Sequence, residues 1–237
     1  MRLYNLENDI NEVPEWVQQS FEGFRNTMSD NSNPFPCHFA KTGIEKSSFR
    51  YTYIKNGELK KPEIFKEALV DYLNRYKSFG WPSVLVVFIE NNGEASLDVH
   101  ESAFWNILQY LVSSDNRPWP IEIPNNPENY KWQFCFHGTP LFITGHSSVY
   151  KKRRSRHCSS DMMMVIQTME TLQPVTGGSK RADLVRKTIR NRVNEYDEIP
   201  VSPLIGAYPD RHSREWKQFW LPEENNDKKQ CPLHFSK

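Results

Sequence analysis

The chain has 237 residues, of which 30 are Lys or Arg and 29 are Asp or Glu, so its formal net charge is +1. This near neutrality excludes a strongly basic nucleic-acid coat and a polybasic membrane-surface protein. The longest apolar run, residues 84–89, is far shorter than the roughly 20 residues that span a bilayer. The N-terminus lacks an apolar leader, and four cysteines are too few for a disulfide scaffold. We therefore expect a soluble, cytoplasmic protein with reduced thiols.

The first part of the chain shows helical and strand patterns in turn. Apolar residues at three- and four-residue spacing predict a helix over residues 16–28. An aromatic and β-branched run predicts a strand over Phe49–Ile54, and an amphipathic helix is expected after Pro62. A strand is expected over residues 83–89, and because every residue after Ser83 is apolar, it is predicted to be buried on both faces.

The middle of the chain predicts a further helix and a hairpin. Asp98, followed by Glu101, is expected to cap a helix whose apolar side chains include Phe104 and Leu108. After a proline-rich loop, alternating aromatic residues lead to His137-Gly138, where a hairpin turn is expected.

The last part of the chain predicts one more strand and one more helix. The strand is expected over residues 162–167, and the helix over residues 180–194. This helix is expected to bury four apolar side chains, Leu184, Val185, Ile189 and Val193. Residues 224–237 are expected to form a charged, frayed tail. The mixture of elements, without strict βαβ alternation, favours a single α+β domain over residues 1–237, with a mainly antiparallel central sheet flanked by helices.

Common nucleotide and hydrolase signatures do not occur in the sequence. It contains no P-loop, no G-x-G-x-x-G, no G-x-S-x-G and no H-E-x-x-H motif. No site for a nicotinamide, a flavin or a nucleoside triphosphate can therefore be recognised.

A basic run follows the expected hairpin. His146 comes at the end of a predicted strand, and five cations fall within residues 151–156. The run can be a solvated turn, or a patch for the phosphates of a nucleic acid. It can also bind a cofactor with paired carboxylates, because arginine forks bind carboxylates and histidine is a common haem ligand. On that third interpretation, Gly145 would let a flat macrocycle approach the backbone.

Cys37 lies in a rigid Pro-x-Pro-Cys segment, which suits either a packed side chain or a fixed ligand. Together with His38, Cys231 and His234 it could also compose a zinc site. Structural zinc sites normally use two well-spaced ligand pairs, and the tail supplies a single C-x-x-H. We therefore do not expect zinc.

Carboxylates cluster near the end of the last predicted helix, at Asp197 and its neighbours, and again at Glu215. They can bind a cationic substrate by charge-assisted hydrogen bonds. They can equally be surface partners for nearby Lys and Arg, each contributing little to stability.

Several of these segments together resemble the YqcI/YcgG family of bacterial proteins. The resemblance extends in order over nearly the whole chain, so it is specific for the family. The matching segments are residues 35–40, 132–142, 153–156, 189–197, 200–203, 215–218 and 231–232.

The resemblance implies a function, because characterised members of that family are haem-dependent N-oxygenases that hydroxylate guanidino nitrogens. It implies haem b bound near His146, the expected axial ligand, with Cys37 as the rival ligand. The other cofactor-binding residues that we expect are Arg153, Arg154 and Arg156.

The resemblance also implies partners for such an enzyme. Asp197 or Glu215 would bind a small cationic substrate, and a separate reductase would supply electrons, since no flavin motif is present. A homodimer is compatible with the sequence, and neither a membrane nor a nucleic acid is expected as a partner. The alternatives are a non-enzymatic haem sensor and an anion- or nucleic-acid-binding module that uses residues 151–156.

Overall fold

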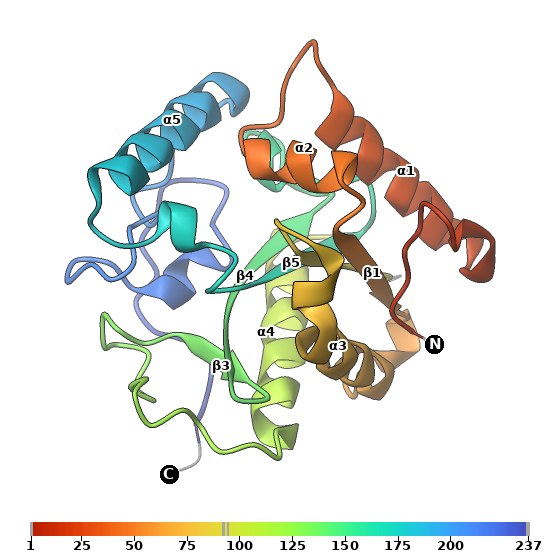
Figure 1. The fold of residues 1–237 in the computed structure, drawn as a ribbon, viewed down its shortest axis with the longest axis horizontal. Coiled ribbons are helices and arrows are strands. Elements are labelled where there is room, and N and C mark those ends of the chain that lie inside the picture. Colours follow the sequence, from red (N-terminus) through yellow and green to blue (C-terminus); the bar gives the residue numbers. More distant parts are fainter. Residues whose placement is uncertain (1, 92, 94, 236–237) are drawn as a thin grey trace.

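The structure, a computed structural model, describes residues 2–91, 93 and 95–235, and of His38 the backbone alone. Within these residues five strands form one sheet in the order β1-β2-β5-β4-β3 (Figure 1). The strands are β1 (Phe49–Ile54), β2 (Val84–Ile89), β3 (Phe134–Phe136), β4 (Thr139–Ser147) and β5 (Met162–Thr168). Strands β1 and β2 are parallel, whereas the other neighbouring pairs are antiparallel. The expected α+β fold with a mainly antiparallel sheet is confirmed.

Helices cover both faces of this sheet (Figure 1). They are α1 (Glu15–Ser29), α2 (His38–Glu45), α3 (Glu63–Arg75), α4 (Leu97–Ser114) and α5 (Lys180–Tyr196). Four of them match helices expected from the sequence, and α2 was not expected. Across the described ranges, no helix is both long enough and apolar enough to cross a membrane.

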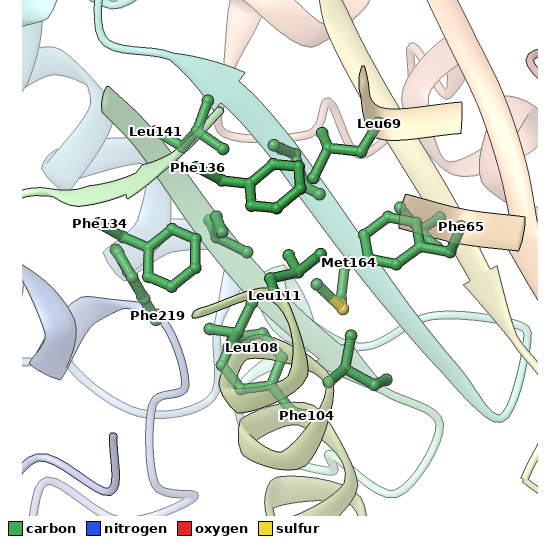
Figure 2. Close-up of a cluster of buried hydrophobic side chains, with 14 of the residues drawn as sticks. Phe65, Leu69, Phe104, Leu108, Leu111, Phe134, Phe136, Leu141, Met164 and Phe219 are labelled. Carbon is green, nitrogen blue, oxygen red and sulfur yellow. The ribbon is translucent and has the colours of Figure 1, made fainter. Parts of the chain in front are cut away.

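The larger hydrophobic core lies on the face of the sheet covered by α3 and α4. Figure 2 shows side chains of these two helices converging with those of β3 and β5, Met164 among them. Every second residue of a strand faces this core, so β5 contributes Met162, Met164 and Ile166. A large aromatic group from residues 216–220 completes it.

The opposite face is divided between a smaller core and a hollow. Helix α1 packs Phe21 and Phe24 against Tyr51 of β1 and Phe88 of β2. Every residue of β2 is buried, so the prediction that this strand is covered on both faces is confirmed. Over the neighbouring part of β5 and β4, side chains of α1, α2 and α5 surround the hollow.

The hairpin between β3 and β4 has the expected turn. His137 and Gly138 have φ angles of 53° and 72°, and both central residues of a type I′ turn require such positive values.

Two helix details differ from the predictions. Ser96, not Asp98, caps α4, because the Ser96 hydroxyl accepts a 3.3 Å hydrogen bond from the Val99 N–H. Helix α5 buries Val193 but leaves Leu184 65% exposed. Ile189 and Val193 of α5 line a hollow, whereas Leu184 lines neither that hollow nor a core, which the local pattern could not show.

The C-terminal segment packs against the core, although the sequence favoured a frayed tail over residues 224–237. Cys231 and Leu233 are buried in the larger core. The His234 N–H donates to Gln109 Oε1 at 2.8 Å, and the Phe235 ring lies 5.4 Å from that of Trp119. These long-range contacts hold the segment on α4 up to residue 235, where the described residues end.

Gly145 has a different role from the one expected. A Cβ atom built on it would lie 2.3 Å from Trp220 Cε3 and 3.0 Å from Phe104 Cδ2. The space beside Gly145 is therefore filled by the core on the α4 side, and a macrocycle cannot approach the backbone there.

We predict that Gly145→Ala destabilises the protein by about 1–3 kcal/mol, because the methyl group would overpack the Trp220 contact. Urea unfolding followed by tryptophan fluorescence measures this change. Gly57→Ala is the matched control, since no atom lies within 4 Å of its Cβ position. Equal stability of the two variants would contradict this account of Gly145.

Candidate functional site

A cavity of about 270 Å³ lies over β4 and β5, on the face of the sheet opposite α3 and α4. Its volume is near the lower limit for small-molecule sites in proteins. Its floor consists of Phe142, Thr144 and His146 from β4 and Met163, Val165 and Gln167 from β5. Its walls come from α1, α2, α5 and the short helix η5 (Gln173–Val175). Figure 1 shows α2 and α5 above these two strands.

Strand pairing explains why these side chains share one floor. Successive side chains of a strand point to opposite faces, so every second residue of β4 and β5 faces the cavity. The pairing places His146 opposite Met163 and Thr144 opposite Val165. The residues between them, such as Met164, belong to the larger core instead.

His146 is the one histidine of the cavity lining among the described side chains, and it is 6% exposed. Its Nε2 lies 3.0 Å from Thr144 Oγ1, whereas Nδ1 is buried and has no hydrogen-bond partner among the described residues. Burial, together with the nearby Arg156 charge, holds the pKa of His146 well below its ordinary value. The imidazole is therefore neutral, and one of its two nitrogens carries a free lone pair. If Nε2–H donates to Thr144, that lone pair is on Nδ1.

Cys37 lines the same cavity from the N-terminal end of α2. Its side chain is half-buried, and all four cysteines of the chain are free thiols. Burial raises the pKa of the Cys37 thiol. Neighbouring N–H groups and Arg192 lower it, but by less, so the net effect is a raised pKa. Without a bound metal ion the group is a neutral thiol, and so it is a weaker ligand than the imidazole of His146.

Arg156 is the third expected site residue on the cavity wall. Its guanidinium donates to three backbone carbonyls, those of Gly145 and Phe219 at 3.3 Å and that of Gln218 at 3.0 Å. No carboxylate in the described part of the chain pairs with it, and burial lowers its pKa to about 10. It remains a cation at neutral pH, and the nearby Asp197 favours its charged form without forming an ion pair with it.

The charge of the cavity restricts what can bind there. Among its described lining residues Arg156 carries the sole formal charge, and no Asp or Glu is present. Most of the lining is apolar, with a few hydroxyl and amide groups. An apolar ligand with an anionic group fits such a site, because a buried cation needs a counter-charge.

Arg153 and Arg154, two further residues of the basic run, point elsewhere. Arg153 is fully buried and donates to the Pro222 and Glu223 carbonyls, at 2.9 and 3.2 Å, which fixes the C-terminal segment. Arg154 is exposed and lies over the Tyr196 ring at 5.0 Å. Neither lines the cavity. The run is thus divided between structural and exposed roles and does not form a continuous basic surface.

Asp197 is buried beside the short helix η4 (Arg154–Arg156) and does not line the cavity. Its carboxylate accepts hydrogen bonds from Ser155, at 2.6 Å from N and 2.8 Å from Oγ. Burial raises its pKa despite these bonds. The carboxylate therefore positions η4, and through it Arg156.

Glu215, in the short helix η6 (Glu215–Gln218), also lies outside the cavity lining. It is 5% exposed, and both carboxyl oxygens are buried without a partner among the described residues. Burial raises its pKa well above its usual value. Burial disfavours the charged form of Glu215, and the side chain does not line the cavity.

The described residues contain no group of three or more His, Cys, Asp or Glu side chains that could hold a metal ion. Cys37 lies at the cavity, whereas Cys231 is buried in the larger core on the other face. The side chain of His38 lies outside what the structure describes.

Sequence reasoning missed Thr144 and α2. Thr144 could have been found, because it precedes His146 by two residues and therefore shares its face of β4. Helix α2 has just eight residues, fewer than the window over which periodicity predicts a helix.

Comparison with known proteins gives a consistent result over the whole chain. The model of the YqcI/YcgG family matches residues 24–234. The uncharacterized proteins YqcI and YcgG of Bacillus subtilis (strain 168) are each 30% identical to the chain; the alignments cover 97% and 98% of it, and 92% and 93% of those proteins. DcsA of Streptomyces lavendulae, provisionally named an N(omega)-hydroxy-L-arginine synthase, is 28% identical over 98% of the chain and 89% of its own length. No solved structure gives a significant match.

We predict that Glu215→Gln changes how stability depends on pH. The raised pKa means that the folded state keeps a proton that the unfolded chain loses above about pH 4.3. The contribution of this group to the stability of the fold is therefore present at low pH. It is lost as the pH rises toward the pKa that the group has in the folded state. Between the pKa of the unfolded chain and that of the folded state, the free energy of unfolding of Glu215→Gln should rise relative to that of the wild type by up to about 1.4 kcal/mol per pH unit.

Urea unfolding at about pH 5 and about pH 7 measures this effect. The control is Glu22→Gln, which removes an exposed carboxyl group from α1. A Glu215→Gln variant whose stability follows the wild type at both values would show that Glu215 is ionised in the folded state.

Proposed function

The chain belongs to the YqcI/YcgG family, and on this premise we propose that it is a haem-dependent N-oxygenase. The proposed reaction is hydroxylation of a guanidino or amine nitrogen of a small cationic metabolite, with O₂ and an external reductant. The observation that carries the proposal is that His146, Cys37 and Arg156, from three separate segments, line the same cavity.

The similarity to DcsA supports the reaction type. The name of that protein gives an N-hydroxylated arginine as its product, and the similarity covers nearly all of both chains. We therefore propose N-hydroxylation for this chain, with a nitrogen-containing side chain as the substrate group.

The cavity residues fit a haem in three respects. His146 would hold the iron through its neutral imidazole, and the Thr144 hydroxyl, 3.0 Å from Nε2, would fix the tautomer. The guanidinium of Arg156, which lines the cavity, suits a propionate carboxylate. The apolar lining suits the macrocycle.

The cavity is small for a haem. About 270 Å³ is less than a porphyrin occupies, so part of the wall must give way for it. We expect helix α5 to be the part of the wall that moves, because just two of its described side chains, Ala182 and Val193, are buried.

When bound, haem would supply the redox chemistry that makes O₂ a hydroxylating agent. The balance of the reaction is one oxygen atom inserted into an N–H bond and the other released as water, with two electrons and two protons consumed. We propose that a separate reductase supplies the electrons. The role of the chain itself is to hold the ligand through His146 and Arg156 and to exclude water.

We predict that His146→Ala abolishes the haem Soret absorption of the protein, whereas Cys37→Ala retains it, since the imidazole is the better donor of the two. The measurement is absorption of each purified full-length variant after haem reconstitution. His212→Ala, an exposed loop histidine outside the cavity, is the control. Survival of an unchanged spectrum in His146→Ala would rule out His146 as the ligand.

Turnover separates an enzyme from a haem sensor. The haem-loaded protein is supplied with O₂, NADPH and a general reductase, and is given L-arginine and other amino acids with side-chain nitrogens. A product heavier by one oxygen atom supports the N-oxygenase. Haem binding without such a product from any of them would favour the sensor, and absence of haem binding would eliminate both interpretations.

A further inference from the structure

The cavity over β4 and β5 has a charged end and an apolar end. Its floor runs along β4 from Phe142 to His146, over about 13 Å at about 3.3 Å per residue. Arg156 lies at the His146 end, because its guanidinium donates to the carbonyl of Gly145, the residue before His146. The Phe142 end lies where β5 finishes, and the chain that follows β5 lines it with Leu172 and the helix η5.

The guanidinium of Arg156 has donors that the fold does not use. It carries five N–H groups, and its three hydrogen bonds, to the carbonyls of Gly145, Gln218 and Phe219, all come from the two terminal nitrogens. Its Nε–H and at least one further N–H therefore have no acceptor among the described residues. Arg156 is 8% exposed, and a buried guanidinium with unused N–H groups is best satisfied by an anionic acceptor.

Gln218 supplies a neutral amide beside this guanidinium. Its backbone carbonyl accepts from Arg156 Nη2 at 3.0 Å, and the residue is buried and lines the cavity. Its side-chain amide forms no hydrogen bond within the described part of the chain. Since no Asp or Glu is among the described lining residues, the charged end offers its donors to a single carboxylate from a ligand.

The volume of the cavity limits the size of that ligand. An apolar cavity of about 150 Å³ admits benzene. At about 270 Å³, the cavity admits a ligand of about ten non-hydrogen atoms without any movement of its wall. A phenyl ring on a short carboxylate chain meets this limit, whereas a porphyrin exceeds it.

We propose that the haem-free chain binds a small apolar monocarboxylate, such as 3-phenylpropanoate, in this cavity. The carboxylate binds the unused N–H groups of Arg156, and the apolar body lies on Phe142 and Val165 and points toward Leu172. A ligand bound in this way occupies the space and the cation that a haem propionate would use, so it competes with haem and limits cofactor loading. The competition rests on the proposed function, whereas the binding itself does not.

The first test compares ligands that differ in one group. Isothermal titration of the haem-free full chain measures binding of 3-phenylpropanoate, of 3-phenylpropan-1-ol, which has a hydroxyl group in place of the carboxylate, and of acetate, which lacks the apolar body. We expect 3-phenylpropanoate to bind about ten- to a hundredfold more tightly than the alcohol, because the alcohol cannot form charge-paired bonds with Arg156. Acetate should bind about tenfold more weakly or worse, since it buries no ring.

Two substitutions test the two parts of the cavity separately. Arg156→Gln should weaken 3-phenylpropanoate binding about ten- to a hundredfold and leave binding of the alcohol nearly unchanged, so that the selectivity for the carboxylate is lost. Val165→Phe fills part of the apolar space and should weaken both ligands alike, by about tenfold. Because Val165→Phe and the ligand comparison do not depend on Arg156→Gln, they remain decisive if that variant does not fold.

Matched controls make the same changes outside the cavity. Arg181→Gln removes an exposed cation from α5, and Val99→Phe enlarges a side chain of α4 that is 38% exposed. Neither should change the affinity for either ligand by more than about twofold. Circular dichroism melting curves show whether each variant is folded.

Competition is measured by haem titration followed at the Soret band, with and without 3-phenylpropanoate. The apparent affinity for haem should fall as the concentration of 3-phenylpropanoate rises, and it should fall much less with the alcohol.

Two results would overturn the inference. One is that the wild type binds 3-phenylpropanoate no more tightly than the alcohol, or binds neither. The other is that bound 3-phenylpropanoate leaves the affinity for haem unchanged. Selective binding of the carboxylate by a protein that never takes up haem keeps the ligand site and removes the proposed function. Haem binding by a protein with no such selectivity does the reverse.

Discussion

The pairing of β4 with β5 is the constraint on which the site depends. One face of this pair carries the larger core, and the other face carries the floor of the cavity. Because side chains alternate along a strand, a slip of one residue would send His146 into the core and bring Gly145 to the floor. The packing of Trp220 against Gly145 opposes such a slip, since no side chain fits there. The position of the proposed ligand is therefore a consequence of core packing.

The charges near the cavity are arranged so that one cation, Arg156, lines it and no described acid does. Arg156 is held by backbone carbonyls, which leaves its charge available to an anion in an apolar cavity. Asp197 lies nearby but is engaged by Ser155, and burial raises the pKa of Glu215, which does not line the cavity. An anionic group in the cavity is compatible with this arrangement.

Local sequence patterns predicted most of the fold. Periods of two and of three to four residues placed all five strands and four of the five helices, because these periods reflect burial on one face of an element. The sequence also singled out His146, Cys37 and Arg156 individually. It could not show that they meet, since β4, α2 and η4 come together only through the packed sheet. The exposure of Leu184 on α5 was missed for the same reason, because a hydrophobic stripe does not reveal whether it meets a core or a hollow.

The basic run of residues 151–156 illustrates what the sequence could and could not predict. The sequence by itself determined that arginines follow the strand that ends near His146, and that their charge requires partners. Only the tertiary structure decided their separate roles. Arg153 is buried against carbonyls about 70 positions later, Arg154 lies exposed on Tyr196, and Arg156 reaches the cavity. The physical reason is that a buried guanidinium must be satisfied by hydrogen-bond acceptors, and here those acceptors come from distant segments that the fold brings beside the run.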